Sequence, residues 1–111
     1  MDIDGEDERY IQVFTTIDDR EEADKIAESV VEQEVAACVQ IVGTIESTYE
    51  WKGELTKSDE WLCILKSRKT SYEELEEVLL EEHPYENPEI LAIPVVEGSP
   101  DYLRWIDDQM K

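Results

Sequence analysis

The run from Val35 to Trp51 alternates between apolar and polar residues, and this alternation constrains the fold more than any other feature of the chain. Because successive side chains of a strand point to opposite faces, a period of two predicts a long β-strand. Gly43 interrupts the run, and a glycine inside a strand often marks a bulge or a bend. The apolar face of this strand is expected to carry Val39, Ile41, Ile45, Tyr49 and Trp51, opposite Gln40, Thr44, Glu46 and Thr48, with Val42 as an apolar exception.

A reversal follows this strand directly. The dipeptide Lys52-Gly53 predicts a tight turn, and the apolar run Glu60 to Ser67 predicts the returning strand. Together these segments predict a hairpin that is long enough to project beyond a small domain.

The first part of the chain predicts a strand and a helix. Tyr10 to Thr16 is rich in β-branched and aromatic residues, which favour a strand. Asp18 followed by Glu21 has the spacing of a capping box and predicts a helix start, and the helix is expected to end near Gln33-Glu34. One apolar stripe at helical spacing is expected to be buried: Ala23, Ile26, Ala27, Val30 and Val31.

The last part of the chain repeats this pattern. Thr70 and Glu73 predict a second capping box, and the helix is expected to run to about Glu82, because Pro84 excludes the helical conformation from the residue before it. The apolar run Ile90 to Val96 predicts a strand. Ser99 and Pro100 are a good N-cap and first helical residue, and the short terminal helix they open has one apolar side, formed by Leu103, Ile106 and Met110.

The order of elements is therefore β-α-β-β-α-β with a short C-terminal helix. This order predicts an α+β, ferredoxin-like sandwich, in which two helices cover one face of an antiparallel sheet. Residues 9–111 are expected to form one domain, and the acidic residues 1–8 are expected to be disordered.

The two last predicted strands are apolar on both faces. In Ile90 to Val96 and in Glu60 to Ser67, apolar residues occupy both alternating sets of positions. Two helices cover only one face, so the other would expose a large apolar patch, which soluble monomers rarely tolerate. Symmetric self-association is the commonest way to bury such a face, and we expect an oligomer.

The net charge of −20, from 30 acidic and 10 basic residues, excludes classes of partner. Binding to nucleic acid or to an anionic membrane through a basic patch is not expected. The acidic residues are scattered through every segment, which favours a solvated surface suited to high salt, as in a halophile. A cation-binding surface is the alternative.

Cys38 and Cys63 do not form a C-x-x-C pair, and the sequence has neither a signal-peptide pattern nor a long apolar run. A reduced, cytoplasmic protein is therefore expected. Both cysteines lie in apolar runs, where a thiol most often acts as a small core residue.

His83, the only histidine, is the best single candidate for a metal ligand or a proton carrier. An equally simple interpretation is a helix C-terminal histidine favoured by the helix dipole. Cys38, Cys63, Glu86 and Glu89 could complete a metal site, but no ligand spacing links them.

Other candidates are a lone cation and a set of aromatic residues. Lys66 lies inside an apolar strand, where it could bind a carboxylate or an anionic ligand, or simply point outward from an edge. Aromatic residues near the strand ends could pack an interface or line a cleft: Tyr49, Trp51, Tyr85, Tyr102 and Trp105. The sequence contains no nucleophile elbow, phosphate-binding loop, dinucleotide fingerprint or zinc cluster, so we do not expect an enzyme.

Four motifs together resemble one known family. They are Ala36-Ala37-Cys38-Val39, Tyr49-Glu50-Trp51-Lys52-Gly53, His83-Pro84-Tyr85-Glu86-Asn87-Pro88-Glu89-Ile90 and Tyr102-Leu103-Arg104-Trp105. In this combination and order they resemble the divalent-cation tolerance proteins of the CutA family. The resemblance covers nearly the whole chain from Tyr10, with Ile17-Asp18 standing where members usually have a proline.

The resemblance implies a PII-like homotrimer linked to tolerance of copper and other divalent cations. It implies that His83, Cys38 and Glu89 are candidate metal ligands, with copper or another divalent cation as the possible cofactor. It also implies a cleft between subunits that is lined by Tyr49, Trp51, Lys66, His83, Tyr85, Glu89 and Trp105. Two alternatives stay open: a PII-like signalling or scaffold trimer that binds a small ligand or a partner protein, and an enzyme using Lys66, Tyr85 and Glu89.

Overall fold

The computed structural model describes residues 9–110, so the predicted acidic tail, residues 1–8, lies outside the described residues. Four strands form one antiparallel sheet in the order β2-β3-β1-β4, which confirms the predicted α+β, ferredoxin-like fold. The elements in chain order are β1 (Tyr10–Ile17), α1 (Arg20–Glu32), β2 (Cys38–Trp51), β3 (Glu54–Arg68), the short 3₁₀ helix η1 (Lys69–Ser71), α2 (Tyr72–Glu82), β4 (Leu91–Pro94) and α3 (Pro100–Gln109).

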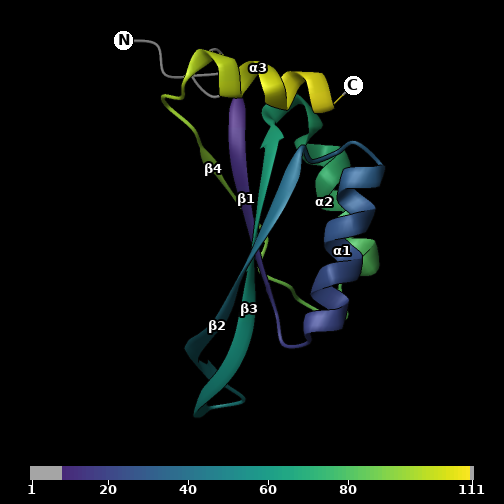
Figure 1. The fold of residues 1–111 in the computed structure, drawn as a ribbon. Coiled ribbons are helices and arrows are strands. Elements are labelled where there is room, and N and C mark those ends of the chain that lie inside the picture. The colour runs from purple at the N-terminus through teal and green to yellow at the C-terminus, as the bar shows by residue number, and fades with distance from the viewer. Residues whose placement is uncertain (1–8, 111) are drawn as a thin grey trace.

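Helices α1 and α2 lie side by side over one face of the sheet (Figure 1). The alternate residues of β1 and β3 that face them are buried, and Val13, Ile17 and Leu65 have no exposed surface. Burying each side chain of this kind contributes about 1.5–3 kcal/mol. The core between the sheet and the helices is formed mainly by Val13, Ile17, Ala23, Ile26, Val30, Cys63, Leu65, Leu75 and Leu79.

Helix α3 packs across one end of the opposite face (Figure 1). The Tyr10 hydroxyl donates to Asp107 Oδ2 at 2.7 Å, and Arg68 Nη1 lies 3.2 Å from Asp107 Oδ1. The hydrogen bond from Tyr10, with help from Arg68, holds the pKa of the Asp107 carboxyl below its usual value. Ile106 and Met110 pack beside Ala37, so an apolar contact and a charged contact together fix α3.

Apart from α3 at one end and the loop of His83 and Tyr85, which bonds to Thr16 and Glu60, no described element covers this second face, and we call it the open face. It carries exposed apolar residues, as expected from the strands that are apolar on both sides. Val42 is 45% exposed, Leu91 58% and Ile93 40%. Within residues 9–110, none of the helices has both the length and the apolar character needed to cross a bilayer.

The β2–β3 hairpin projects beyond the helices, as predicted (Figure 1). Its turn uses positive φ at Lys52 (50°) and Gly53 (81°). The strand register shifts between Val42 and Ile45, which confirms the bulge predicted at Gly43. The returning strand begins at Glu54, well before Glu60, because backbone pairing with β2 extends to the turn through a polar segment without a clear alternation.

Some predicted element ends were wrong by a few residues. Asp19, not Asp18, caps α1, since its Oδ1 accepts from the backbone N–H groups of Glu21 and Glu22 at 2.8 and 3.2 Å. Thr70 does not cap α2, because it lies inside η1 and the helix begins after Ser71 without a side-chain cap. Strand β2 begins at Cys38 and β4 spans only Leu91–Pro94, so both are shorter than the apolar runs suggested.

The close approach of Gly43 to Trp61 gives the first prediction. A Cβ atom on Gly43 would overlap the indole ring of Trp61, which packs against the core with the Arg20 guanidinium 5.1 Å from its centre. We expect Gly43→Ala to lower the free energy of unfolding by about 1–3 kcal/mol, the usual cost of overpacking. Urea unfolding followed by circular dichroism measures this change in the free energy of unfolding.

Gly53→Asn is the control for this variant. Gly53 has a positive φ of 81°, which asparagine tolerates, and a Cβ atom added there would meet nothing within 4 Å. This change should alter stability by less than about 0.5 kcal/mol. Equal losses in the two variants would contradict a steric role for Gly43.

Candidate functional site

His83 lies at the end of α2 in an extended conformation (φ −76°, ψ 134°), as the following Pro84 predicts. It is only 7% exposed, and both of its ring nitrogens have backbone partners. Nε2 lies 2.8 Å from the Thr16 carbonyl oxygen, and Nδ1 lies 3.1 Å from the Tyr85 backbone nitrogen. Because a carbonyl can only accept and an N–H can only donate, Nε2 carries the proton and Nδ1 accepts. The ring is neutral in this arrangement and ties α2 to β1.

Tyr85 continues this network to a buried carboxylate. Its hydroxyl donates to Glu60 Oε2 at 2.8 Å, and the Ser47 hydroxyl donates to Glu60 Oε1 at 2.6 Å. Glu60 is 7% exposed. Burial, followed by the hydrogen bond to Glu60 and the charge of that carboxylate, raises the pKa of Tyr85 well above its usual value. The phenol therefore stays protonated and acts as a donor. We call Thr16, Ser47, Glu60, His83 and Tyr85 the Glu60 network.

A second group, which we call the Cys38 cluster, lies on the same face of the sheet where α3 packs. It consists of Cys38, Lys66, Tyr102 and Trp105. Cys38 and Lys66 are paired across β2 and β3, and Lys66 Nζ lies 5.9 Å from the centre of the Tyr102 ring. The Tyr102 and Trp105 rings stack with centroids 5.6 Å apart. Burial, together with the neighbouring Cys38 thiol, raises the pKa of Tyr102.

The two cysteines lie on opposite faces of the sheet. Cys38 is half-buried on the face where α3 packs, whereas Cys63 is fully buried in the core under α1 and α2. Burial raises the pKa of the Cys63 thiol to about 11, so it stays protonated. Of the two, only Cys38 is placed to meet a ligand.

The remaining predicted site residues lie apart from both groups. Tyr49 and Trp51 lie on the projecting hairpin, where the Tyr49 hydroxyl is 3.3 Å from Ser58 Oγ and Trp51 is 59% exposed. Glu89 is exposed in the loop before β4. Of the eight predicted residues, the structure brings together His83 with Tyr85, and Cys38 with Lys66 and Trp105.

The proposed metal ligands do not converge within one chain. Cys38 pairs with Lys66 of β3, while His83 bonds to Thr16, which pairs with Leu62. Four residues of a strand separate Lys66 from Leu62, or about 13 Å at 3.3 Å per residue. Across residues 9–110, no three His, Cys, Asp or Glu side chains lie close enough to hold a metal ion. A single copy therefore does not fit a copper ion held by Cys38, His83 and Glu89 together.

Sequence reasoning missed Glu60, Ser47 and Thr16. One signal was available, because Glu60 shares the period-two face of Leu62 and Ile64, and a carboxylate on an apolar face needs partners. The identity of those partners was not available, since Ser47 and Tyr85 lie far from Glu60 in the sequence.

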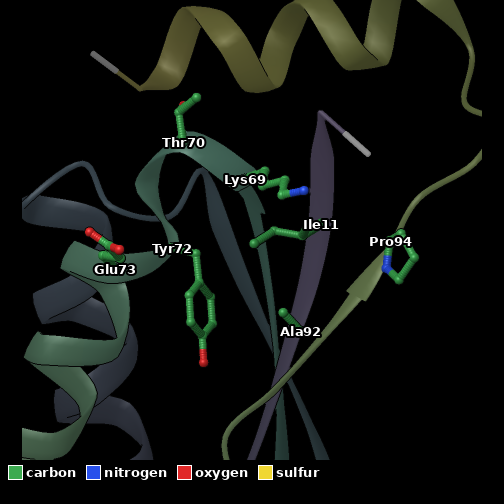
Figure 2. A pocket seen from close by; sticks show the side chains of 7 residues that line it. All are labelled: Ile11, Lys69, Thr70, Tyr72, Glu73, Ala92 and Pro94. Carbon is green, nitrogen blue, oxygen red and sulfur yellow. The ribbon is translucent and has the colours of Figure 1, made fainter. Parts of the chain in front are cut away.

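A cavity of about 380 Å³ lies elsewhere, between the β1–β4 edge and the start of α2 (Figure 2). Its β-sheet wall is apolar, and its other wall comes from η1 and α2. The Tyr72 hydroxyl in that wall already donates to Glu76 Oε2 at 2.9 Å. The residues that line the cavity do not include any predicted site residue: Ile11, Lys69, Thr70, Tyr72, Glu73, Ala92 and Pro94.

Comparison with known proteins points to one family. Residues 11–109 match the family of the CutA1 divalent ion tolerance protein. The chain is 39% identical over 94 residues to the divalent-cation tolerance protein CutA of Thermus thermophilus, which covers 85% of this chain and 91% of the relative. It is 41% identical over 101 residues to the chloroplastic protein CutA of Arabidopsis thaliana, which covers 91% of this chain and 56% of the relative.

The fold agrees with solved structures of the same kind. The crystal structure of CutA1 from Oryza sativa superposes with a TM-score of 0.90 at 34% identity, covering 93% of this chain and 94% of that one. The chain spans a little over half the length of the plant and animal relatives from Arabidopsis thaliana, Mus musculus and Xenopus laevis.

The Glu60 network gives the second prediction. Tyr85→Phe removes a hydroxyl donor from a buried carboxylate, and a hydrogen bond to a charged group contributes about 1.5–3 kcal/mol. We expect a loss of that size in the free energy of unfolding, measured by chemical denaturation at neutral pH.

Tyr72→Phe is the matched control. It removes the same hydroxyl from a bond to Glu76, which lies one helical turn away on α2 and is less buried than Glu60. Its cost should be below about 1 kcal/mol. A loss in Tyr85→Phe no larger than in this control would contradict the role given to Glu60.

Proposed function

This chain belongs to the family of CutA1 divalent ion tolerance proteins, and we propose that it acts as a homotrimeric divalent-cation tolerance protein that binds copper. The observation that carries the proposal is the family match over residues 11–109, nearly the whole chain. The proposal has three further parts: the trimeric assembly, the identity of the metal and the identity of its ligands. Each is supported by observations of the structure.

The open face supports the homotrimer. Apolar side chains such as Val42, Leu91 and Ile93 are exposed on one chain, and a second copy would remove them from water. The sheet also ends in two unpaired edge strands, β2 and β4, and the hairpin projects far enough to reach a neighbour. Closed symmetric assembly would bury the face and the edges at once.

Cys38 is the ligand that the geometry favours. It is half-buried on the face where α3 packs, and a soft thiolate prefers copper to harder divalent ions. Glu89 is exposed and free to turn toward an ion. His83 would have to release the Tyr85 N–H before Nδ1 could bind a metal. Since these donors do not converge in one chain, we propose that a bound ion takes ligands from more than one copy.

We further propose a cytoplasmic, non-enzymatic protein. Two unpaired thiols, at Cys38 and Cys63, suit a reducing compartment. The residues considered for acid–base chemistry do not form one set, because Tyr85 bonds to Glu60 whereas Lys66 lies beside Tyr102. General acid–base catalysis requires the groups within hydrogen-bond reach of one substrate.

The copper proposal predicts a difference between the two cysteines. A calorimetric titration with copper in molar KCl should give a saturable site that magnesium does not occupy. Cys38→Ser should weaken copper binding by about tenfold or more, equivalent to roughly 1.4 kcal/mol, because it removes the soft ligand.

Cys63→Ala is the matched control, since it deletes a thiol that is buried in the core on the other face of the sheet. It should leave copper affinity unchanged. Weak, unsaturating heats shared by copper and magnesium would contradict the proposal and leave only the acidic surface as a cation binder.

The Cys38 cluster supports a second candidate function, a PII-like signalling or scaffold trimer that binds a small anionic ligand. Lys66 is a half-buried cation in a chain of charge −20, and it lies against an exposed aromatic stack. A cation beside stacked rings suits a planar or carboxylate-bearing anion.

This alternative predicts that citrate or inorganic phosphate binds through Lys66. Lys66→Ala should lower the affinity about fivefold, the size expected for one partly exposed ion pair. Lys57→Ala, which removes an exposed hairpin lysine, is the control. The alternative is excluded if neither anion binds the unmodified protein in isothermal titration.

A further inference from the structure

The open face carries almost no charge, although 30 of the 111 residues are acidic. Among its residues in the sheet, two bear a charge: Lys66, and Arg68 at the α3 end, which forms an ion pair with Asp107. This face of the sheet consists of Tyr10, Gln12, Phe14, Thr16, Cys38, Gln40, Val42, Leu62, Ile64, Lys66, Arg68, Leu91 and Ile93.

The same face continues onto the projecting hairpin with little added charge. Ile45, Ser47, Tyr49 and Trp51 of β2 stand opposite Glu60, Ser58, Thr56 and Glu54 of β3. Glu60 is buried and bonded within the Glu60 network, so Glu54 at the tip is the exposed carboxylate on this side.

The acidic residues are concentrated on the helices of the other face instead. On α1, Glu21, Glu28 and Glu32 are exposed. On α2, the exposed carboxylates are Glu73, Glu74, Glu77, Glu81 and Glu82. The helix side of the sheet is therefore strongly negative, whereas the open face itself is apolar and nearly neutral. On the side of the open face, exposed carboxylates lie on α3, at Asp101 and Asp108.

A second copy is the occupant that fits this face. A basic partner would be attracted to the acidic helices and would gain nothing from a surface without charge. A copy of the same chain can cover apolar strands with apolar strands and leave its own acidic helices in solvent. This step rests on the proposed homotrimer.

Each copy also brings a charge of −20 to the assembly, and this opposes association. One molecule measures 44 × 35 × 22 Å, so acidic surfaces on neighbouring copies lie within a few tens of ångströms of each other. The Debye length is about 30 Å at 0.01 M salt, about 10 Å at 0.1 M and about 3 Å at 1 M. Copies therefore repel one another across the whole assembly at low salt and hardly at all in molar salt.

We propose that assembly through the open face is gated by ionic strength: the trimer forms when salt screens the acidic helices, and it dissociates when the salt is removed. The apolar contact supplies the attraction at every salt concentration. The net charge of this chain, to which the exposed carboxylates of α1 and α2 contribute, decides the concentration at which that attraction prevails.

Sedimentation velocity across KCl concentrations from about 0.02 to about 2 M tests this proposal. Over this range the Debye length falls from about the width of one molecule to less than the separation of neighbouring charges. The mass should change from that of one chain, 12.9 kDa, to three times that value as salt rises. The midpoint salt concentration should fall as protein concentration rises, because association depends on concentration. If the midpoint does not depend on protein concentration, salt acts on the folding of single chains and not on their association. That result would overturn the proposal.

Two charge variants sharpen the test. Converting Glu28, Glu32, Glu77 and Glu81 to Gln removes four negative charges that are exposed on α1 and α2, away from the open face. The midpoint should move to lower salt by about twofold or more, since repulsion grows with the product of the charges. The matched control converts the same four residues to Asp, which keeps the charge, and it should leave the midpoint in place.

A third variant tests the face itself. Val42→Asp puts a carboxylate at an exposed apolar site of the open face, on the edge strand β2, and this variant should remain a single chain in molar salt. Assembly of this variant like that of the unmodified chain would overturn the assignment of the interface.

The remaining outcomes separate this inference from the proposed function. A trimer at every salt concentration would overturn salt gating and leave the homotrimer intact. A single chain even in about 2 M KCl, where screening is nearly complete, would overturn both. Full assembly by magnesium at an ionic strength where KCl gives none would replace screening with specific cation sites, and it would also overturn the proposal.

Discussion

The structure depends on the covering of one sheet face by α1 and α2 while the other face stays open. The covered face supplies the core, because the alternate residues of β1 and β3 pack against the apolar stripes of both helices. The same alternation forces every second residue of these strands onto the open face. Since Leu62, Ile64, Leu91 and Ile93 are apolar as well, the sheet that stabilises one chain also creates a surface that one chain cannot bury.

Two polar groups interrupt this apolar face at separate places. The Glu60 network joins the root of the hairpin to the loop after α2 through hydroxyl donors on a buried carboxylate. The Cys38 cluster joins β2, β3 and α3 through a thiol, a cation and stacked rings. The network has its hydrogen bonds satisfied and acts as a structural connection, whereas the cluster leaves Cys38 and Lys66 accessible in part. This difference favours the cluster as the place where a cation or a ligand would meet the chain.

Charge and apolar surface are segregated across the sheet. Carboxylates cover the helices, and the open face has little more than Lys66 and the tip residue Glu54. This segregation suits the proposed assembly, because solvated carboxylates would keep assembled copies dispersed while the neutral face was buried. The short-range attraction between apolar faces and the long-range repulsion between carboxylates act against each other, and salt weakens only the repulsion.

Sequence alone determined the order of the elements, the turn at Lys52-Gly53, the bulge at Gly43 and the extended conformation of His83 before Pro84, because each depends on residues close together in the chain. Strand and helix ends were predicted less accurately. Backbone pairing with β2 extended β3 to Glu54, and Asp19 rather than Asp18 caps α1 because its side chain accepts from the first N–H groups of the helix. Only the tertiary structure decided which side chains meet. The register that pairs Cys38 with Lys66 and Thr16 with Leu62 separates Cys38 from His83, and it is set by packing between distant segments. For the same reason, no local pattern could have joined Glu60 to Ser47 and Tyr85.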